Sequence, residues 1–168
     1  MASQITGATE IAVHTYQALY GQAASNALLN SYVAQIGSSD GYAWANSLAA
    51  GFVATSNSDF ATLLLTNLGI TASTITASAS FPTPAATYTA LQAALTEYLR
   101  ANGVASRGTV AVQMAEQFSN MEGETTWGTY GAAATAFNAQ SLANFTYSSN
   151  TANTVSAAVS TATGQTYT

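Results

Sequence analysis

Residues 83–103 read TPAATYTALQAALTEYLRANG, and this stretch decides the fold class. Thr83 is a favourable N-cap, and Pro84 stands at the first helical position, where its missing N–H costs nothing. Large apolar side chains follow at the spacing of one helix face, namely Tyr88, Leu91, Leu95, Tyr98 and Leu99. Gly103 is a typical helix stop. The stretch therefore predicts a long amphipathic helix with a defined start and end.

The same apolar spacing, punctuated by glycine, recurs on both sides of this stretch. Further helices are expected at about 9–20, 26–36, 42–54, 58–68 and 106–122, and a last one from residue 124 or 125 to about 145. Residues 71–81, TASTITASASF, lack a helical period and predict a loop or a short extended piece. We therefore predict an all-α fold, a single domain of about six or seven short helices over residues 1–150.

Residues 151–168 differ from the rest of the chain, because they contain many hydroxyl groups and no charge. A helix over 151–162 is the first expectation and an extended arm the second, since Thr, Val and Tyr favour strands. The final six residues are expected to be frayed or extended. With nothing in the segment to oppose docking, Val155, Val159 and Tyr167 are predicted to contact a neighbouring copy of the chain.

The charge content of the 168 residues is very low, at 5% against about a quarter in an average protein. Two arginines, no lysine and seven acids give a net charge of −5, which excludes nucleic acid and anionic membranes as partners. No apolar run is long enough for a transmembrane segment. The absence of cysteine excludes disulfides and thiolate chemistry, and one histidine excludes a multi-histidine metal centre.

The acidic residues suggest few sites of chemistry. Glu122 and Glu124, with Asn120, are candidate calcium ligands, although a helix end with an acidic first turn is the preferred explanation of the two glutamates. His14 follows Glu10 by four residues, which we interpret as a structural pair on one helix face. No nucleophile motif accompanies His14, and no spacing pairs the carboxylates of Asp40, Asp59, Glu97 and Glu116 as in a glycosidase. We therefore expect no enzyme.

The remaining candidates for binding residues are the two arginines and three aromatic residues. Arg100, near Glu97, and Arg107 are interpreted as surface or interhelical partners. The aromatic residues Tyr42, Trp44 and Trp127 could stack on sugar rings, although aromatics at helical spacing are usually core residues.

Four blocks of sequence carry a resemblance to a known group. They are TYQALYG at 15–21, DFATLLLTNLG at 59–69, the block 108–120 that begins GTVAVQM, and YGAAATAFN at 130–138, which leads to Tyr147 and Ser148. In this order they resemble the N-terminal helical domain of S-layer-like and RTX-type bacterial surface proteins that are exported by type I secretion. The glycine- and aspartate-rich calcium repeats of that group do not follow here. The resemblance implies an extracellular structural role.

Composition and resemblance together predict a function. We expect an extracellular, cell-surface structural protein that self-assembles into a surface layer or filament, and therefore a homo-oligomer or polymer. The alternative is a polysaccharide-binding module that anchors such a layer, with cell-surface polysaccharide as its partner. Calcium is the one cofactor considered. Residues 1–4 show no cleavable secretory signal, which taken alone favours the cytoplasm and equally permits export by an uncleaved C-terminal signal. The composition of residues 151–168 suits such a signal, as the resemblance implies.

Overall fold

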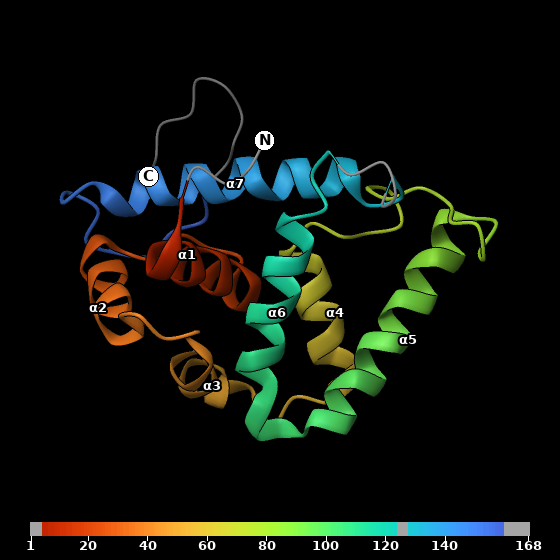
Figure 1. Cartoon of the computed structure of the whole chain (residues 1–168), viewed down its shortest axis with the longest axis horizontal. Coiled ribbons are helices and arrows are strands. Elements are labelled where there is room, and N and C mark those ends of the chain that lie inside the picture. Colours follow the sequence, from red (N-terminus) through yellow and green to blue (C-terminus); the bar gives the residue numbers. More distant parts are fainter. Residues whose placement is uncertain (1–4, 124–127, 160–168) are drawn as a thin grey trace.

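The computed structural model describes residues 5–123 and 128–159 (Figure 1). These residues form seven α-helices and no β-strand beyond one isolated bridge, which confirms the all-α fold. The elements are α1 (Gly7–Tyr20), α2 (Asn26–Ile36), α3 (Tyr42–Ala49), the 3₁₀ helix η1 (Ala50–Phe52), α4 (Asn57–Asn67), α5 (Pro84–Asn102), the 3₁₀ helix η2 (Val104–Ser106), α6 (Arg107–Ser119) and α7 (Gly131–Ser149).

Helix α5 has the ends that its sequence predicts. The Oγ1 of Thr83 accepts a hydrogen bond from the Ala86 N–H at 3.1 Å. At the other end, the N–H of Gly103 donates to the Leu99 carbonyl at 3.0 Å. Gly103 has a φ of +76°, which only glycine adopts without strain. Capping groups within the segment therefore set the limits of this helix.

Helices α3 and α7 differ most from their predicted bounds. The helix expected at 42–54 ends at Ala49 and continues as the 3₁₀ turn η1. The last helix begins at Gly131, because residues 128–130 form a turn. The carbonyl of Thr129 accepts a hydrogen bond from the Thr76 N–H at 3.1 Å, which ties this turn to the long loop before α5.

Two large apolar clusters form most of the core, and both run through α1 and α6, while a third, small one contains Ala23, Tyr147 and Val159. One cluster joins α4, α5, α6 and α7 around Phe60, Leu99 and Phe118, with Ala18 and Leu19 of α1. The other joins α1, α2, α3 and α6 around Trp44, with Val13 of α1 and Val112 of α6. Helix α7 lies across the ends of α1 and α6, and α5 packs on α4 at the far side (Figure 1). Helices α1 and α6 are therefore the central pair.

Helices α3 and α6 approach each other closely at Gly108. A Cβ atom added to Gly108 would lie 2.0 Å from the carbonyl carbon of Ala45. Beside this contact, the Thr109 N–H donates to Asn46 Oδ1 at 2.8 Å, and Asn46 Nδ2 donates to Thr109 Oγ1 at 3.0 Å. The missing side chain of glycine is thus what allows the two backbones to meet.

The two arginines have different surroundings. Arg100 donates to Glu97 on the exposed face of α5, as predicted. Arg107 is 2% exposed, so of the two predicted roles, surface or interhelical partner, the surface role is wrong. Its guanidinium donates to the Phe52 carbonyl, to the Thr55 carbonyl at 2.6 Å and to Asn57 Oδ1 at 2.9 Å. Arg107 is therefore an interhelical partner that holds the segment between η1 and α4 against α6.

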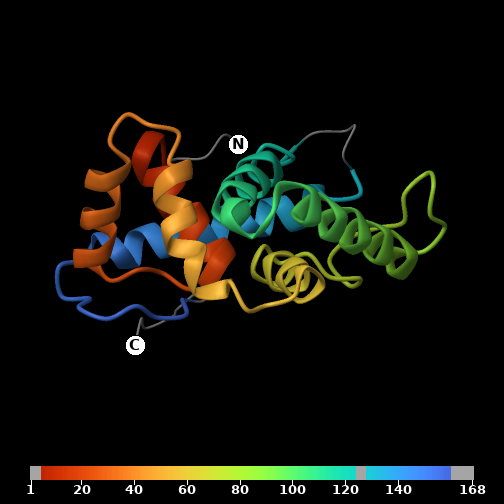
Figure 2. The ribbon, with the colours of Figure 1, turned by 90° about the horizontal axis from the view of Figure 1, so that it is seen from below.

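Residues 150–159 form an arm that lies on the chain's own body, and the helix predicted over 151–162 is absent from its described part. Ala157 pairs antiparallel with Ala23 in the segment between α1 and α2 (Figure 2). Ser156 Oγ accepts a hydrogen bond from the Tyr16 hydroxyl at 3.0 Å. Backbone pairing with this segment replaces the hydrogen bonds that a helix would supply.

The described helices include no single one that is long and apolar enough to cross a membrane. Only the pair Tyr42–Phe52 and Asn57–Asn67 has sufficient length and composition, and its two parts are bent by 116°.

Candidate functional site

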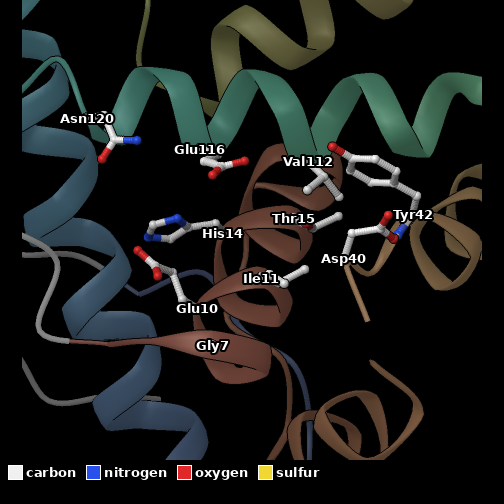
Figure 3. A pocket seen from close by; sticks show the side chains of 10 residues that line it. All are labelled: Gly7, Glu10, Ile11, His14, Thr15, Asp40, Tyr42, Val112, Glu116 and Asn120. Atoms are coloured by element: carbon white, nitrogen blue, oxygen red, sulfur yellow. The ribbon is translucent and has the colours of Figure 1, made fainter. Parts of the chain in front are cut away.

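A pocket of about 430 Å³ lies between α1 and α6, beside the start of α3 (Figure 3). This volume is in the range of small-molecule sites, which is roughly 300–1,000 Å³. The lining residues are Gly7, Glu10, Ile11, His14, Thr15, Asp40, Tyr42, Val112, Glu116 and Asn120.

Helical spacing brings the polar side chains to this pocket. Glu10 and His14 are one turn apart on α1, so they share a face. Val112, Glu116 and Asn120 follow the same spacing along α6 and at its C-cap, and their stripe faces α1 (Figure 3). The wall of the pocket is thus built from one stripe of each central helix.

Three of the seven acidic residues of the chain line this one pocket: Glu10, Asp40 and Glu116. Neither arginine lines it. Asp40 Oδ1 accepts a hydrogen bond from the Tyr42 N–H at 3.0 Å, which fixes the start of α3 beside the pocket. In a chain with so little charge, the negative potential is concentrated here.

His14 lies in the wall of the pocket, with Glu10 on one side and Glu116 on the other (Figure 3). The side chain is only 3% exposed, and its ring packs on that of Phe137 at a centroid distance of 5.0 Å. Nε2 is buried and has no hydrogen-bond partner in the described part of the chain. Burial lowers the pKa of His14 to about 4, so the imidazole is neutral at physiological pH.

Thr15 is the second buried polar residue of the wall. Its Oγ1 has no hydrogen-bond partner within residues 5–123 and 128–159. His14 therefore does not activate this hydroxyl, as the base of a nucleophilic enzyme would. The pocket instead offers acceptors, which are the carboxylates, the amide oxygen of Asn120 and a neutral imidazole.

The predicted calcium ligands have different surroundings in the described structure. Asn120 lines the pocket, whereas Glu122 Oε2 accepts a hydrogen bond from Asn138 Nδ2 at 2.6 Å on α7. Glu124 lies outside the described residues. Within the described ranges, no group of three or more His, Asp or Glu residues is placed to hold a metal ion.

The described residues among the predicted sugar-stacking set also have different surroundings. Tyr42 lines the pocket, but Trp44 is 8% exposed and packs on Tyr32 at a centroid distance of 5.2 Å. The prediction that Trp44 stacks on a sugar is therefore wrong, because its ring belongs to the core. Trp127 lies outside the described residues.

The predicted assembly residues have unequal exposure. Val155 is 63% exposed, so its side chain is available to another molecule. Val159 is 8% exposed and packs with Ala23 and Tyr147 of its own chain. Its side chain is therefore not available to a neighbouring copy in this structure. Tyr167 lies beyond the described residues.

Comparison of the chain with protein-family models, curated proteins and solved structures finds no match. The resemblance to S-layer-like proteins rests on the four sequence blocks alone. These blocks fall in α1, α4, α6 and α7, which are helices of the core.

The burial of His14 predicts a loss of stability between about pH 6.5 and pH 4. In this range the unfolded chain binds the proton and the folded chain does not, so unfolding becomes more favourable as the pH falls. The full shift is worth about 3 kcal/mol of the free energy of unfolding. Urea unfolding at neutral pH and near pH 4.5 should show most of this loss in the wild-type protein.

The matched variant is His14→Leu, which removes the titrating group and places an apolar side chain against Phe137. Every other titratable group is the same in the two proteins, so the informative quantity is the difference between them. The same pH dependence in both proteins would contradict the prediction.

Proposed function

We propose that this chain is an extracellular structural protein that self-assembles into a surface layer or filament. The main support is an uncharged end of the molecule, formed by residues 17–39 and 139–159. These two stretches contain no Asp, Glu, Lys or Arg. They include α2, the part of α7 from residue 139 onward and the arm at 150–159, which lie together in the fold.

The uncharged end is held in shape by internal hydrogen bonds. Asn26 Nδ2 donates to the Ser148 carbonyl at 2.8 Å, and the Ser148 hydroxyl donates to the Ala24 carbonyl at 2.7 Å. Two apolar side chains stand out from this framework, Leu28 at 37% and Val155 at 63% exposure. A surface that is already ordered loses little conformational entropy when it binds a second copy.

Electrostatics favours contact through this end. The net charge of −5 repels copies from one another, but the described acids lie outside it. Neutral polar groups also cost less to desolvate than charged ones. If the uncharged end meets a different patch of the next copy, the contact is head-to-tail and continues into a filament or layer unless rotation closes it.

A pair of matched substitutions tests this proposal. Val155→Glu places a carboxylate on the uncharged end, whereas Val53→Glu places one in the turn before α4, and both valines are 63% exposed. Val155→Glu should raise the protein concentration needed for assembly by about tenfold or more, because a buried unpaired carboxylate costs over 1.4 kcal/mol. Val53→Glu should leave it unchanged. Light scattering and negative-stain microscopy measure the result.

Two outcomes would contradict the proposal. A wild-type chain that stays monomeric at every concentration would exclude self-assembly, and equal effects of both substitutions would exclude the uncharged end as the contact. The alternative function is a polysaccharide-binding anchoring module, which is supported by the position of Tyr42 beside the acidic pocket. A monomer that sediments with cell-surface polysaccharide would favour that alternative.

A further inference from the structure

We propose that the pocket between α1 and α6 binds a small organic cation with primary ammonium groups. This proposal does not depend on self-assembly, because the pocket lies outside the uncharged end. It rests on three features of the pocket: the sign of its charge, its unpartnered buried atoms, and its size.

Among residues 5–123 and 128–159, the charged groups that line the pocket are all acidic. Glu10 comes from α1, Asp40 from the segment before α3 and Glu116 from α6, so three parts of the fold each contribute a carboxylate. Ionised carboxylates only accept hydrogen bonds, and a primary ammonium group only donates them. Because neither arginine lines the pocket, an anionic ligand finds no arginine to pair with there.

Two buried atoms of the wall lack partners in the described structure. They are Nε2 of His14, a residue 3% exposed, and Oγ1 of Thr15, which is fully buried. A buried polar atom without a hydrogen bond costs about 1–3 kcal/mol, so such atoms are uncommon away from functional sites. Neutral His14 keeps one ring nitrogen as an acceptor, and a hydroxyl can accept too, so N–H groups of a ligand can satisfy both residues.

The size and spread of the acceptors favour an organic cation over a metal ion. The described residues hold no cluster of three His, Asp or Glu placed for one ion. A volume of about 430 Å³ exceeds the roughly 30 Å³ of one water molecule many times over. A ligand with ammonium groups on a short carbon chain can reach carboxylates that a single ion cannot bridge.

Calorimetric titration of the full chain at neutral pH tests the proposal. The probes are 1,4-diaminobutane and 1,4-butanediol, which share a carbon skeleton and differ in charge. The diamine should bind and release heat, and the diol should not. Failure of the diamine to bind, or equal binding of the diol, would overturn the proposal.

Two glutamate variants localise the binding. Glu116→Gln and Glu97→Gln remove the same charge from exposed helix positions, but only Glu116 lines the pocket, since Glu97 pairs with Arg100 on α5. Glu116→Gln should weaken diamine binding about tenfold or more, and Glu97→Gln by less than about twofold. Equal weakening by both would overturn the proposal.

Two further titrations distinguish diamine binding from a metal site and test contact with the buried wall. Calcium chloride that binds tightly and displaces the diamine would show a metal site instead, and would overturn the proposal. His14→Leu removes an acceptor but no net charge at neutral pH, so weaker diamine binding by this variant supports direct contact with the buried wall. Circular dichroism confirms that each variant is folded.

Discussion

Replacing Gly108 with alanine is expected to lower the free energy of unfolding by about 4–5 kcal/mol, which is a large part of the stability of a typical domain. The new Cβ would lie 2.0 Å from the carbonyl carbon of Ala45 and 2.1 Å from its oxygen. Both atoms belong to the backbone, so no side-chain rotation relieves the clash. Helix α3 must move away from α6, and the hydrogen bonds between Asn46 and Thr109 are lost.

Urea unfolding followed by circular dichroism measures this effect, with Gly51→Ala as the control. Gly51 lies in η1 and a Cβ added there meets nothing within 4 Å. The control should change stability by less than about 0.5 kcal/mol. A Gly108→Ala protein as stable as the control would mean that α3 and α6 do not cross as described.

Truncating Phe118 to alanine should cost about 3–5 kcal/mol, because it empties the centre of a packed cluster. Phe118 is 2% exposed, and its ring lies 5.7 Å from that of Phe137 between centroids. The cavity would open between α6 and α7, where neighbouring helices cannot collapse into it fully. Denaturant unfolding at fixed pH gives the difference in free energy between the two proteins.

Phe81→Ala is the matched control for this truncation. Phe81 is 41% exposed in the loop before α5, and its hydrogen bonds to Ser78 involve only backbone atoms of Phe81. Its loss should cost less than about 1 kcal/mol. A loss that small at Phe118 would place that residue on the surface and contradict the core described above.

The helices were predictable where local signals determine them. Thr83, Pro84 and Gly103 set the limits of α5 within its own sequence, and the structure has the same limits. The start of α7 and the conformation of the arm at 150–159 could not be predicted from the sequence, because hydrogen bonds with distant segments decide them. Thr76 binds the turn before α7, and Ala23 pairs with the arm.

The pocket was only partly visible in the sequence. Glu10 and His14 were recognised as neighbours, because a spacing of four residues on one helix is a local property. The approach of α6 to α1, which adds Glu116, depends on tertiary packing that no local pattern encodes. The one further signal was the stripe of Val112, Glu116 and Asn120, whose spacing marks a single face of α6.

The burial of Arg107 makes the folded chain a poor substrate for trypsin. Trypsin cleaves after lysine or arginine, and this chain offers it only the bonds that follow Arg100 and Arg107. Arg107 is enclosed, and Arg100 lies in the last turn of α5, so cleavage requires that turn to unwind first. The first cut after Arg100 would give fragments 1–100 and 101–168. Their rate of appearance therefore measures local opening between α5 and α6.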